Sequence, residues 1–150
     1  PYTTLFRSSL LQEDPNCKIF VMGDMNDDPM DASMHKSLSA KAEIAEVGPN
    51  DMYNPWYNIL AKQGHGTLQY QGKWNLFDQI ILSPNLLNKE GTKDYTTLKY
   101  WKSQIFRRDY LFQQEGKYKG NTKRTTAGGV WLDGYSDHLP VVTYLAKEQK

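Results

Sequence analysis

The stretch Val21-Met22-Gly23-Asp24-Met25-Asn26-Asp27-Asp28-Pro29 passes directly from an apolar run into a cluster of acidic and amide side chains. The apolar run predicts a buried β-strand over 17–22, and Gly23 is expected to end it. Because a strand end holds its neighbours rigidly, the polar side chains that follow are placed where a binding or catalytic site needs them. The stretch alone is ordinary, and it predicts a functional site at the edge of a sheet only together with two later segments.

Two later segments combine apolar and polar residues in the same way. They are Asn75-Leu76-Phe77-Asp78-Gln79-Ile80-Ile81-Leu82-Ser83 and Tyr135-Ser136-Asp137-His138-Leu139-Pro140-Val141-Val142. A carboxylate inside an apolar strand is costly unless it is paired, so Asp78 needs a partner. His138 is the natural one, because a carboxylate on one imidazole nitrogen fixes the tautomer and leaves the other nitrogen for substrate.

The composition is that of an ordinary globular domain. The 150 residues are 39% hydrophobic and 23% charged, which excludes a disordered chain. The formal net charge of +1 neither favours nor excludes a nucleic-acid partner. The single cysteine, Cys17, excludes an internal disulfide. A run of about 18 apolar residues, which a transmembrane helix requires, is absent from the sequence, and localisation stays open.

The first eight residues, Pro1-Tyr2-Thr3-Thr4-Leu5-Phe6-Arg7-Ser8, correspond to the translated tail of a common sequencing adapter. We therefore exclude residues 1–8 from the fold prediction as an assembly artefact. The alternative is a genuine strand or helix start. On the artefact interpretation the domain covers residues 9–150, and an unknown length of natural protein is expected to precede it.

Turn and capping residues divide the remaining chain into strands with a few helices. Helices are expected as a last turn at 9–13, from Asp31 or Ser33 to residue 42, and at 55–62. Strands are expected at 66–71 and 74–82, joined as a hairpin, and at 97–106 and 139–145. A long polar connection is expected at 107–134.

Asp24 and Asn26 lie two residues apart on an expected tight turn. Their side chains can converge on one bound oxygen, such as that of an attacking water or a phosphate. Alternatively, both bond the local backbone in an Asx turn. Asp137 offers a hard oxygen ligand for Mg²⁺ or Mn²⁺ beside His138 as proton carrier, and the alternative is a capping Asp with a partly exposed His.

The neighbouring acidic residues Asp27, Asp28 and Asp31 are expected to solvate the loop and to cap the next helix. Between residues 102 and 124 cations outnumber acids and alternate with aromatic residues. Such a segment can follow a phosphate backbone, and the alternative is a solvated loop. Its candidate substrate contacts are Lys117, Lys119, Lys123 and Arg124. Trp74 is a further candidate, either as a ring that stacks on substrate or as part of the core.

At these residues the chain resembles the endonuclease/exonuclease/phosphatase superfamily, which includes apurinic endonucleases, DNase I, sphingomyelinases and inositol-polyphosphate 5-phosphatases. The late motifs of that superfamily are Gly-Asp-x-Asn, a strand Asp followed by an Ile/Leu-rich run and Ser, and Ser-Asp-His. All three occur here in order, across residues 17–146. The resemblance implies an α/β (α+β) fold, the four-layer αββα sandwich of the DNase I type, truncated here to its C-terminal half.

The resemblance also implies a role for each motif residue. Asp24 would orient or deprotonate the attacking water, and Asn26 would hold that water or the phosphate. Asp137 would ligate Mg²⁺ or Mn²⁺, His138 would contact the scissile phosphate, and Asp78 would support His138. The implied reaction is metal-dependent, in-line attack of water on a phosphate ester, with a phosphodiester as the leading substrate. The alternatives are a phosphomonoesterase acting on a sugar or lipid phosphate, and a non-catalytic binding module.

The chain departs from the superfamily pattern at two points. Met25 replaces the Phe that is usual inside the first motif, which affects packing more than chemistry. The early metal-binding Glu and its neighbouring Asn have no counterpart before Gly23. The resemblance therefore implies that a missing N-terminal half completes the domain, and that this fragment is inactive alone. Nucleic acid, a phosphorylated small molecule or a lipid headgroup is the expected substrate.

Overall fold

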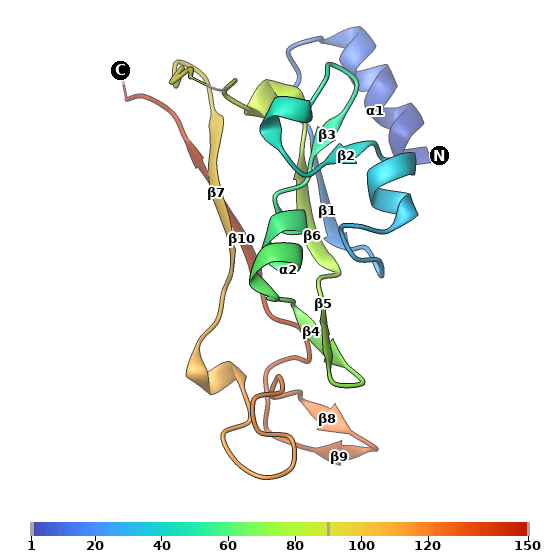
Figure 1. Cartoon of the computed structure of the whole chain (residues 1–150), viewed down its shortest axis with the longest axis vertical. Helices are drawn as coiled ribbons and strands as arrows, with labels where there is room; N and C mark the ends of the chain where they lie inside the picture. Colours follow the sequence, from blue (N-terminus) through green and yellow to red (C-terminus); the bar gives the residue numbers. More distant parts are fainter. Residues whose placement is uncertain (1, 90, 150) are drawn as a thin grey trace.

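The computed structural model describes residues 2–89 and 91–149, which form a mixed α/β fold with short sheets and few helices (Figure 1). This confirms the predicted fold class, while the four-layer arrangement stays a prediction. The helices are α1 (Tyr2–Glu13) and α2 (Trp56–Gln63). Short helical turns cover Ser33–Ser37, Ile44–Glu46, Pro84–Leu86 and Asp109–Leu111. No helix among the described residues is long and apolar enough to cross a membrane.

The main sheet has four strands in the order β1-β6-β3-β2. Their bounds are Phe20–Asp24 for β1, Asp78–Leu82 for β6, Met52–Tyr53 for β3 and Ala40–Lys41 for β2. β6 runs antiparallel to both β1 and β3, and β3 runs parallel to β2. The long segments that carry the first two sequence motifs therefore lie side by side as β1 and β6.

Three two-stranded sheets complete the fold. They pair β10 (Val141–Ala146) with β7 (Lys99–Ile105), β4 (Leu68–Tyr70) with β5 (Lys73–Asn75), and β8 (Thr126–Ala127) with β9 (Val130–Trp131). All three pairs are antiparallel. In Figure 1, β7 and β10 lie to the left of the main sheet and α1 lies to its right.

One part of the core lies between the main sheet and the β7–β10 pair, and another buried cluster packs around Met52 and Ile81. Tyr53 and Leu82 of the main sheet are buried, and Tyr100 of β7 and Leu145 of β10 pack against them. Trp56 of α2 is fully buried, and Ile105 and Val141 pack against its cluster. Each fully buried side chain of this size contributes about 1.5–3 kcal/mol through removal from water. The two sheets and α2 are thus held together by apolar contact close to the start of β10.

The predicted helix over residues 31–42 is wrong. Only a single helical turn, Ser33–Ser37, forms there, and Ala40 and Lys41 join the main sheet as β2. Ser39 has a positive φ of 55°, which ends the helical path. Its hydroxyl donates to the Asp51 carboxylate, and pairing with β3 supplies the backbone hydrogen bonds that a helix would have given. Tertiary contacts therefore outweigh the local helical preference.

The predicted strand over residues 74–82 is interrupted. β5 ends at Asn75 and β6 begins at Asp78, in a different sheet. Leu76 N–H donates to the Asp28 carboxylate, and the Phe77 carbonyl accepts from Met25 N–H, so both linking residues bond the loop after β1 instead of a strand. The predicted hairpin turn is present between β4 and β5.

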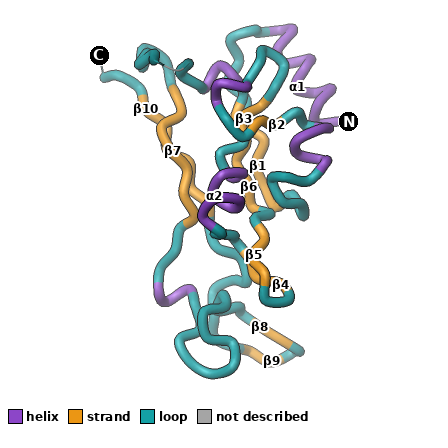
Figure 2. Tube along the Cα trace, viewed as in Figure 1, coloured by secondary structure: helices purple, strands orange, loops and turns teal. Residues whose placement is uncertain are grey.

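One further expectation needs correction. Gly23 does not end the first strand, since β1 continues through it to Asp24. The long connection expected at 107–134 contains the helical turn Asp109–Leu111, an isolated bridge between Phe112 and Thr122, and the β8–β9 hairpin. Figure 2 shows this segment as a loop-rich region at the foot of the fold.

The last turn predicted at 9–13 is the end of a longer helix, α1, which includes residues 2–8. Arg7 belongs to this helix and its side chain is buried. Its guanidinium donates to the carbonyl oxygens of Leu38 at 3.1 Å and Asn50 at 3.0 Å. The Arg7 side chain is thus part of the packed structure. The interpretation of the segment as an assembly artefact stays a prediction about the gene.

Candidate functional site

Two carboxylates face each other across the ends of β1 and β6. The antiparallel register pairs Asp24 with Asp78. Gly23 makes this possible, because its φ of 148° is a conformation that residues with a Cβ rarely adopt. Like charges directly opposite on neighbouring strands are destabilising, so this pair calls for a cationic or hydrogen-bonding partner.

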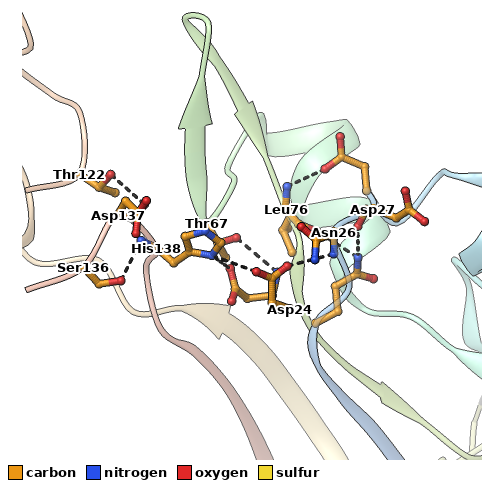
Figure 3. A network of polar contacts seen from close by, with 12 residues as sticks. Asp24, Asn26, Asp27, Thr67, Leu76, Thr122, Ser136, Asp137 and His138 are labelled. Carbon is orange, nitrogen blue, oxygen red and sulfur yellow. Dashed lines mark hydrogen bonds and ion pairs between the residues drawn. The ribbon is translucent and has the colours of Figure 1, made fainter. Parts of the chain in front are cut away.

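His138 supplies that partner from the segment before β10. Its Nδ1 lies 2.7 Å from Oδ2 of Asp78 and 4.0 Å from Oδ2 of Asp24. The side chains are 26%, 22% and 43% exposed for His138, Asp78 and Asp24, so the site is half-buried yet open to solvent. Figure 3 shows the imidazole beside the Asp24 carboxylate. The contact between Asp78 and His138 that the sequence indicated is present, and with Nδ1 donating to Asp78 the other ring nitrogen is left for substrate.

The Asx-turn alternative for the turn after β1 is present at Asp24, and the convergence of Asp24 and Asn26 on one bound oxygen stays a prediction. Oδ1 of Asp24 accepts from the backbone N–H of Asn26 at 2.9 Å, as in an Asx turn. Oδ2 of the same carboxylate faces His138. Asn26 is exposed and has a positive φ of 52°, which asparagine tolerates better than most residues. One oxygen thus fixes the turn while the other remains part of the site.

The donor set of the site suits a divalent cation. Asp24, Asp78 and His138 each offer one ligand atom, and these atoms lie within 4.8 Å of one another. Carboxylate oxygens are the ligands that Mg²⁺ and Mn²⁺ prefer. Asp137 does not join this cluster, since its carboxylate lies 3.2 Å from Nη2 of Arg124. Its carbonyl accepts from the Thr122 hydroxyl at 2.9 Å, as Figure 3 shows.

Gln79 is a residue that the sequence analysis missed. It is fully buried beside Asp78, and its Nε2 donates to the carbonyl oxygens of Asp27 at 2.8 Å and Leu76 at 3.0 Å. Its Oε1 accepts from the Asn54 amide at 2.8 Å. One side chain therefore ties the loop after β1 to the start of β6. An amide within an apolar strand was the available signal, but its partners are distant in sequence.

Thr67 was also missed. It is fully buried, and its Oγ1 accepts from Asp78 N–H at 3.4 Å. Its carbonyl accepts from Leu139 N–H at 2.7 Å, directly after His138. Thr67 thus joins the backbones that carry the two halves of the Asp78–His138 pair.

The acidic residues after β1 bond the structure around them, contrary to the expectation of a solvated loop. Asp28 accepts from Leu76 N–H at 2.6 Å, Asp27 accepts from the Ser33 hydroxyl, and Asp31 accepts from Asp28 N–H at 2.7 Å. Burial raises the pKa of the Asp28 carboxyl, an effect opposed by the Leu76 N–H and reinforced by the nearby Asp31 and Asp27 charges.

Trp74 is half-buried, and its ring contacts two side chains of the 107–134 segment. The Arg107 guanidinium lies 4.8 Å from its ring, and the Phe112 ring meets it edge-on at 6.4 Å. In the structure, Trp74 therefore packs against other side chains of the protein. Burial lowers the pKa of the Arg107 guanidinium.

The four cationic candidates are not gathered at one point. Arg124 contacts the Ser-Asp-His segment through Asp137, and Lys123 is half-buried nearby. Lys117 and Lys119 are exposed, with the Lys117 ammonium 5.5 Å from the Tyr118 ring. The structure therefore brings Arg124 to the site and leaves the exposed lysines on the surface of the segment.

Comparison with known proteins gives one family match. The model of the endonuclease/exonuclease/phosphatase family matches residues 3–147, a range that takes in most of the segment excluded as an artefact. No curated protein and no solved structure shows significant similarity to the chain.

Proposed function

The chain belongs to the endonuclease/exonuclease/phosphatase family, and we propose that this phosphoesterase is divalent-metal-dependent and cleaves phosphodiester bonds. The proposal rests above all on one observation, the 2.7 Å contact of His138 with Asp78 beside the carboxylate of Asp24. An imidazole oriented by one carboxylate and flanked by another is the arrangement that proton transfer and phosphate binding at one centre require.

Each residue then has a distinct role in the proposed reaction. The Asp24 carboxylate orients the attacking water or takes its proton, and the exposed Asn26 amide holds the water or a phosphate oxygen. His138 donates from its free ring nitrogen to the scissile phosphate. Asp78 keeps the imidazole in the required tautomer and orientation, and is a positioning residue rather than a catalytic one.

A divalent cation fits the residues present. We propose that the Asp24 carboxylate at the end of β1 holds it, with Asp137 as a further ligand once its carboxylate leaves Arg124. When bound, the ion neutralises charge that develops on the phosphate. We also propose that a carboxylate from a preceding part of the domain completes the site, as the family resemblance implies.

The phosphodiester substrate is supported by the exposed Lys117 and Lys119 and by the Arg124 guanidinium beside Asp137. Cations spread along a surface segment suit a ligand with several phosphates better than one with a single phosphate. A phosphomonoesterase and a binding module are the competing functions, and they are separated by the experiment below.

The test is Mg²⁺-dependent hydrolysis by the chain alone and by the chain joined to the upstream half of the intact gene. Supercoiled DNA and a panel of phosphomonoesters are offered in parallel. His138→Ala is the inactive variant, and His35→Ala is the matched control, because His35 is exposed and its ring contacts only the Asp31 carbonyl among the described hydrogen bonds.

Nicking of DNA that is lost in His138→Ala and kept in His35→Ala is the expected result. Phosphate release without nicking would replace the diesterase by a monoesterase. Absence of both activities in the joined protein would overturn the proposal in favour of a binding module. Full activity of the chain alone would overturn the need for a further carboxylate.

A further inference from the structure

A cavity of about 610 Å³ lies in the segment between β7 and β10. Residues 110–115 line one side of it, and residues 132–135 line the other, so its wall ends three residues before His138. Its volume falls within the range of about 300–1,000 Å³ that is usual for small-molecule sites. None of the roles assigned above uses this cavity.

Aromatic rings form much of the cavity wall. Tyr110 and Tyr135 meet edge-on, with ring centroids 5.4 Å apart and planes at 68°. They remain 53% and 67% exposed, and Phe112 and Leu132 add apolar surface beside them. A fixed pair of exposed rings of this kind offers stacking and edge contacts to a flat ligand ring. Trp74 cannot offer its ring to such a ligand, because Arg107 and Phe112 already contact that ring.

The charges around the cavity indicate which part of a substrate it holds. Lys123 is the one cation that lines it, against the two carboxylates of Glu115 and Asp133 among the described residues. A phosphate is therefore disfavoured inside the cavity. The carboxylates and the Gln113 amide can instead accept hydrogen bonds from the N–H groups of an uncharged ring.

The cavity is fixed relative to the phosphate site. Tyr135 N–H donates to the Lys123 carbonyl at 2.9 Å, and the Thr125 hydroxyl donates to the Tyr135 carbonyl at 3.0 Å. The Thr122 hydroxyl holds the Asp137 carbonyl, next to His138. Tyr135 lies three residues before His138, and three residues of extended chain span at most about 11 Å, so the cavity wall and the imidazole lie in the same region of the molecule.

We propose that this cavity binds the nitrogenous ring of a nucleoside phosphate ester whose phosphate lies at Asp24, Asp78 and His138. The proposal rests on the proposed phosphoesterase function and adds a substrate class to it. The ring lies against the exposed surface of the Tyr110–Tyr135 pair, its N–H groups donate to Glu115 or Asp133, and the sugar bridges the cavity and the imidazole.

The test is equilibrium binding, measured by calorimetry without turnover. The four ribonucleoside 5′-monophosphates are compared with ribose 5-phosphate, which keeps the sugar and the phosphate but lacks the ring. At least one nucleotide is expected to bind tenfold or more tightly than ribose 5-phosphate. Equal affinity of all five ligands would overturn the proposal.

Three variants locate the effect. Tyr135→Ala should abolish the advantage of the nucleotide over ribose 5-phosphate, whereas Tyr135→Phe should retain it because the ring remains. Tyr118→Ala is the matched control, since Tyr118 is an exposed tyrosine of the same segment outside the cavity wall. An advantage that survives Tyr135→Ala, or that Tyr118→Ala removes equally, would overturn the assignment.

The binding measurement also separates this inference from the proposed function. His138→Ala should weaken the binding of all five ligands by the same factor. It should preserve the tighter binding of the nucleotide relative to ribose 5-phosphate. Hydrolysis of phosphate esters without any nucleotide advantage would leave the phosphoesterase standing and overturn the ring site. A nucleotide advantage in a protein that hydrolyses nothing would support the ring site and overturn the enzyme.

Discussion

At the scale of single residues, the contact between Asp78 and His138 carries the largest functional consequence. We predict that Asp78→Asn lowers the rate of hydrolysis by the chain joined to its upstream half about 10–100-fold. An amide no longer fixes the imidazole in the tautomer that leaves its other nitrogen for phosphate. Steady-state hydrolysis of the best substrate, beside His138→Ala and a wild-type reference, measures the effect.

Asp109→Asn serves as the control, since Asp109 is an exposed residue outside the pair and outside the cavity wall. A wild-type rate in Asp78→Asn, in a variant whose thermal unfolding is unchanged, would show that the 2.7 Å contact has no part in the reaction.

Asp28 governs a pH dependence of stability rather than of rate. Burial raises the pKa of its carboxyl in the folded protein, so its contribution to stability is fully present below the ordinary pKa and is lost as pH rises through the raised value. Asp28→Asn keeps an oxygen to accept from Leu76 N–H and removes the charge. It should raise Tm at pH 7 by about 1–3 °C and change it less near pH 3. A gain that is equal at both pH values, or a loss at pH 7, would contradict this reasoning.

The sequence could reveal Asp78 and His138 but not the residues that position them. An acidic residue inside an apolar strand is unusual enough to require a partner, and the imidazole was the residue able to serve. The most distant hydrogen-bond partner of Gln79 is the Asp27 carbonyl, 52 residues away in the sequence. That of Thr67 is the Leu139 N–H, 72 residues away. Nothing in local composition distinguishes such residues from ordinary strand residues.

At the scale of elements, prediction succeeded where one chain segment decides its own structure. The hairpin between β4 and β5 formed as expected because Gln71 and Gly72 both take the positive φ values, 49° and 78°, that a tight turn needs. The helix expected over 31–42 failed because residues 40–41 pair with β3, a contact that local preference does not encode. The assignment of Asp137 to the metal remains a prediction, and its present bond to Arg124 was invisible in the sequence.

Gly134 links the 107–134 segment to the site. A Cβ at this position would collide with the carbonyl oxygens of Lys123 and Arg124, so no other residue allows the two backbones to approach. Gly134→Ala should destabilise the protein by about 1–3 kcal/mol and should lower nucleotide binding, because it moves Tyr135 off its bond to Lys123. Denaturant unfolding and calorimetry measure the two effects.

Gly120→Ala is the matched control, because a Cβ there meets no atom within 4 Å, although its φ of 85° brings strain. Because Gly134 itself has no positive φ, a loss of stability in Gly134→Ala no larger than that in Gly120→Ala would contradict the cost assigned to the close approach.

At the scale of the whole molecule, charge is nearly balanced, with a formal net charge of +1. Any attraction of a polyanion must therefore come from local clusters and not from a general positive field. If the 107–134 segment holds nucleic acid, neutralising its exposed and half-buried lysines by Lys117→Gln, Lys119→Gln and Lys123→Gln together should weaken binding of single-stranded DNA. Each lysine that releases a counterion contributes about 0.7 to the slope of log K against log salt, so the slope should fall by up to about 2.

The control is a second triple variant with the same loss of charge elsewhere: Lys36→Gln, Lys93→Gln and Lys147→Gln, all exposed. Because both variants have the same net charge, a general field would change both slopes equally, whereas a local contact changes only the first. Fluorescence anisotropy over a range of salt concentrations separates the two cases. An unchanged slope in the first variant would return the lysines to plain solvation and would leave the cavity beside Tyr135, with its excess of carboxylates, as the part of the segment that selects a substrate.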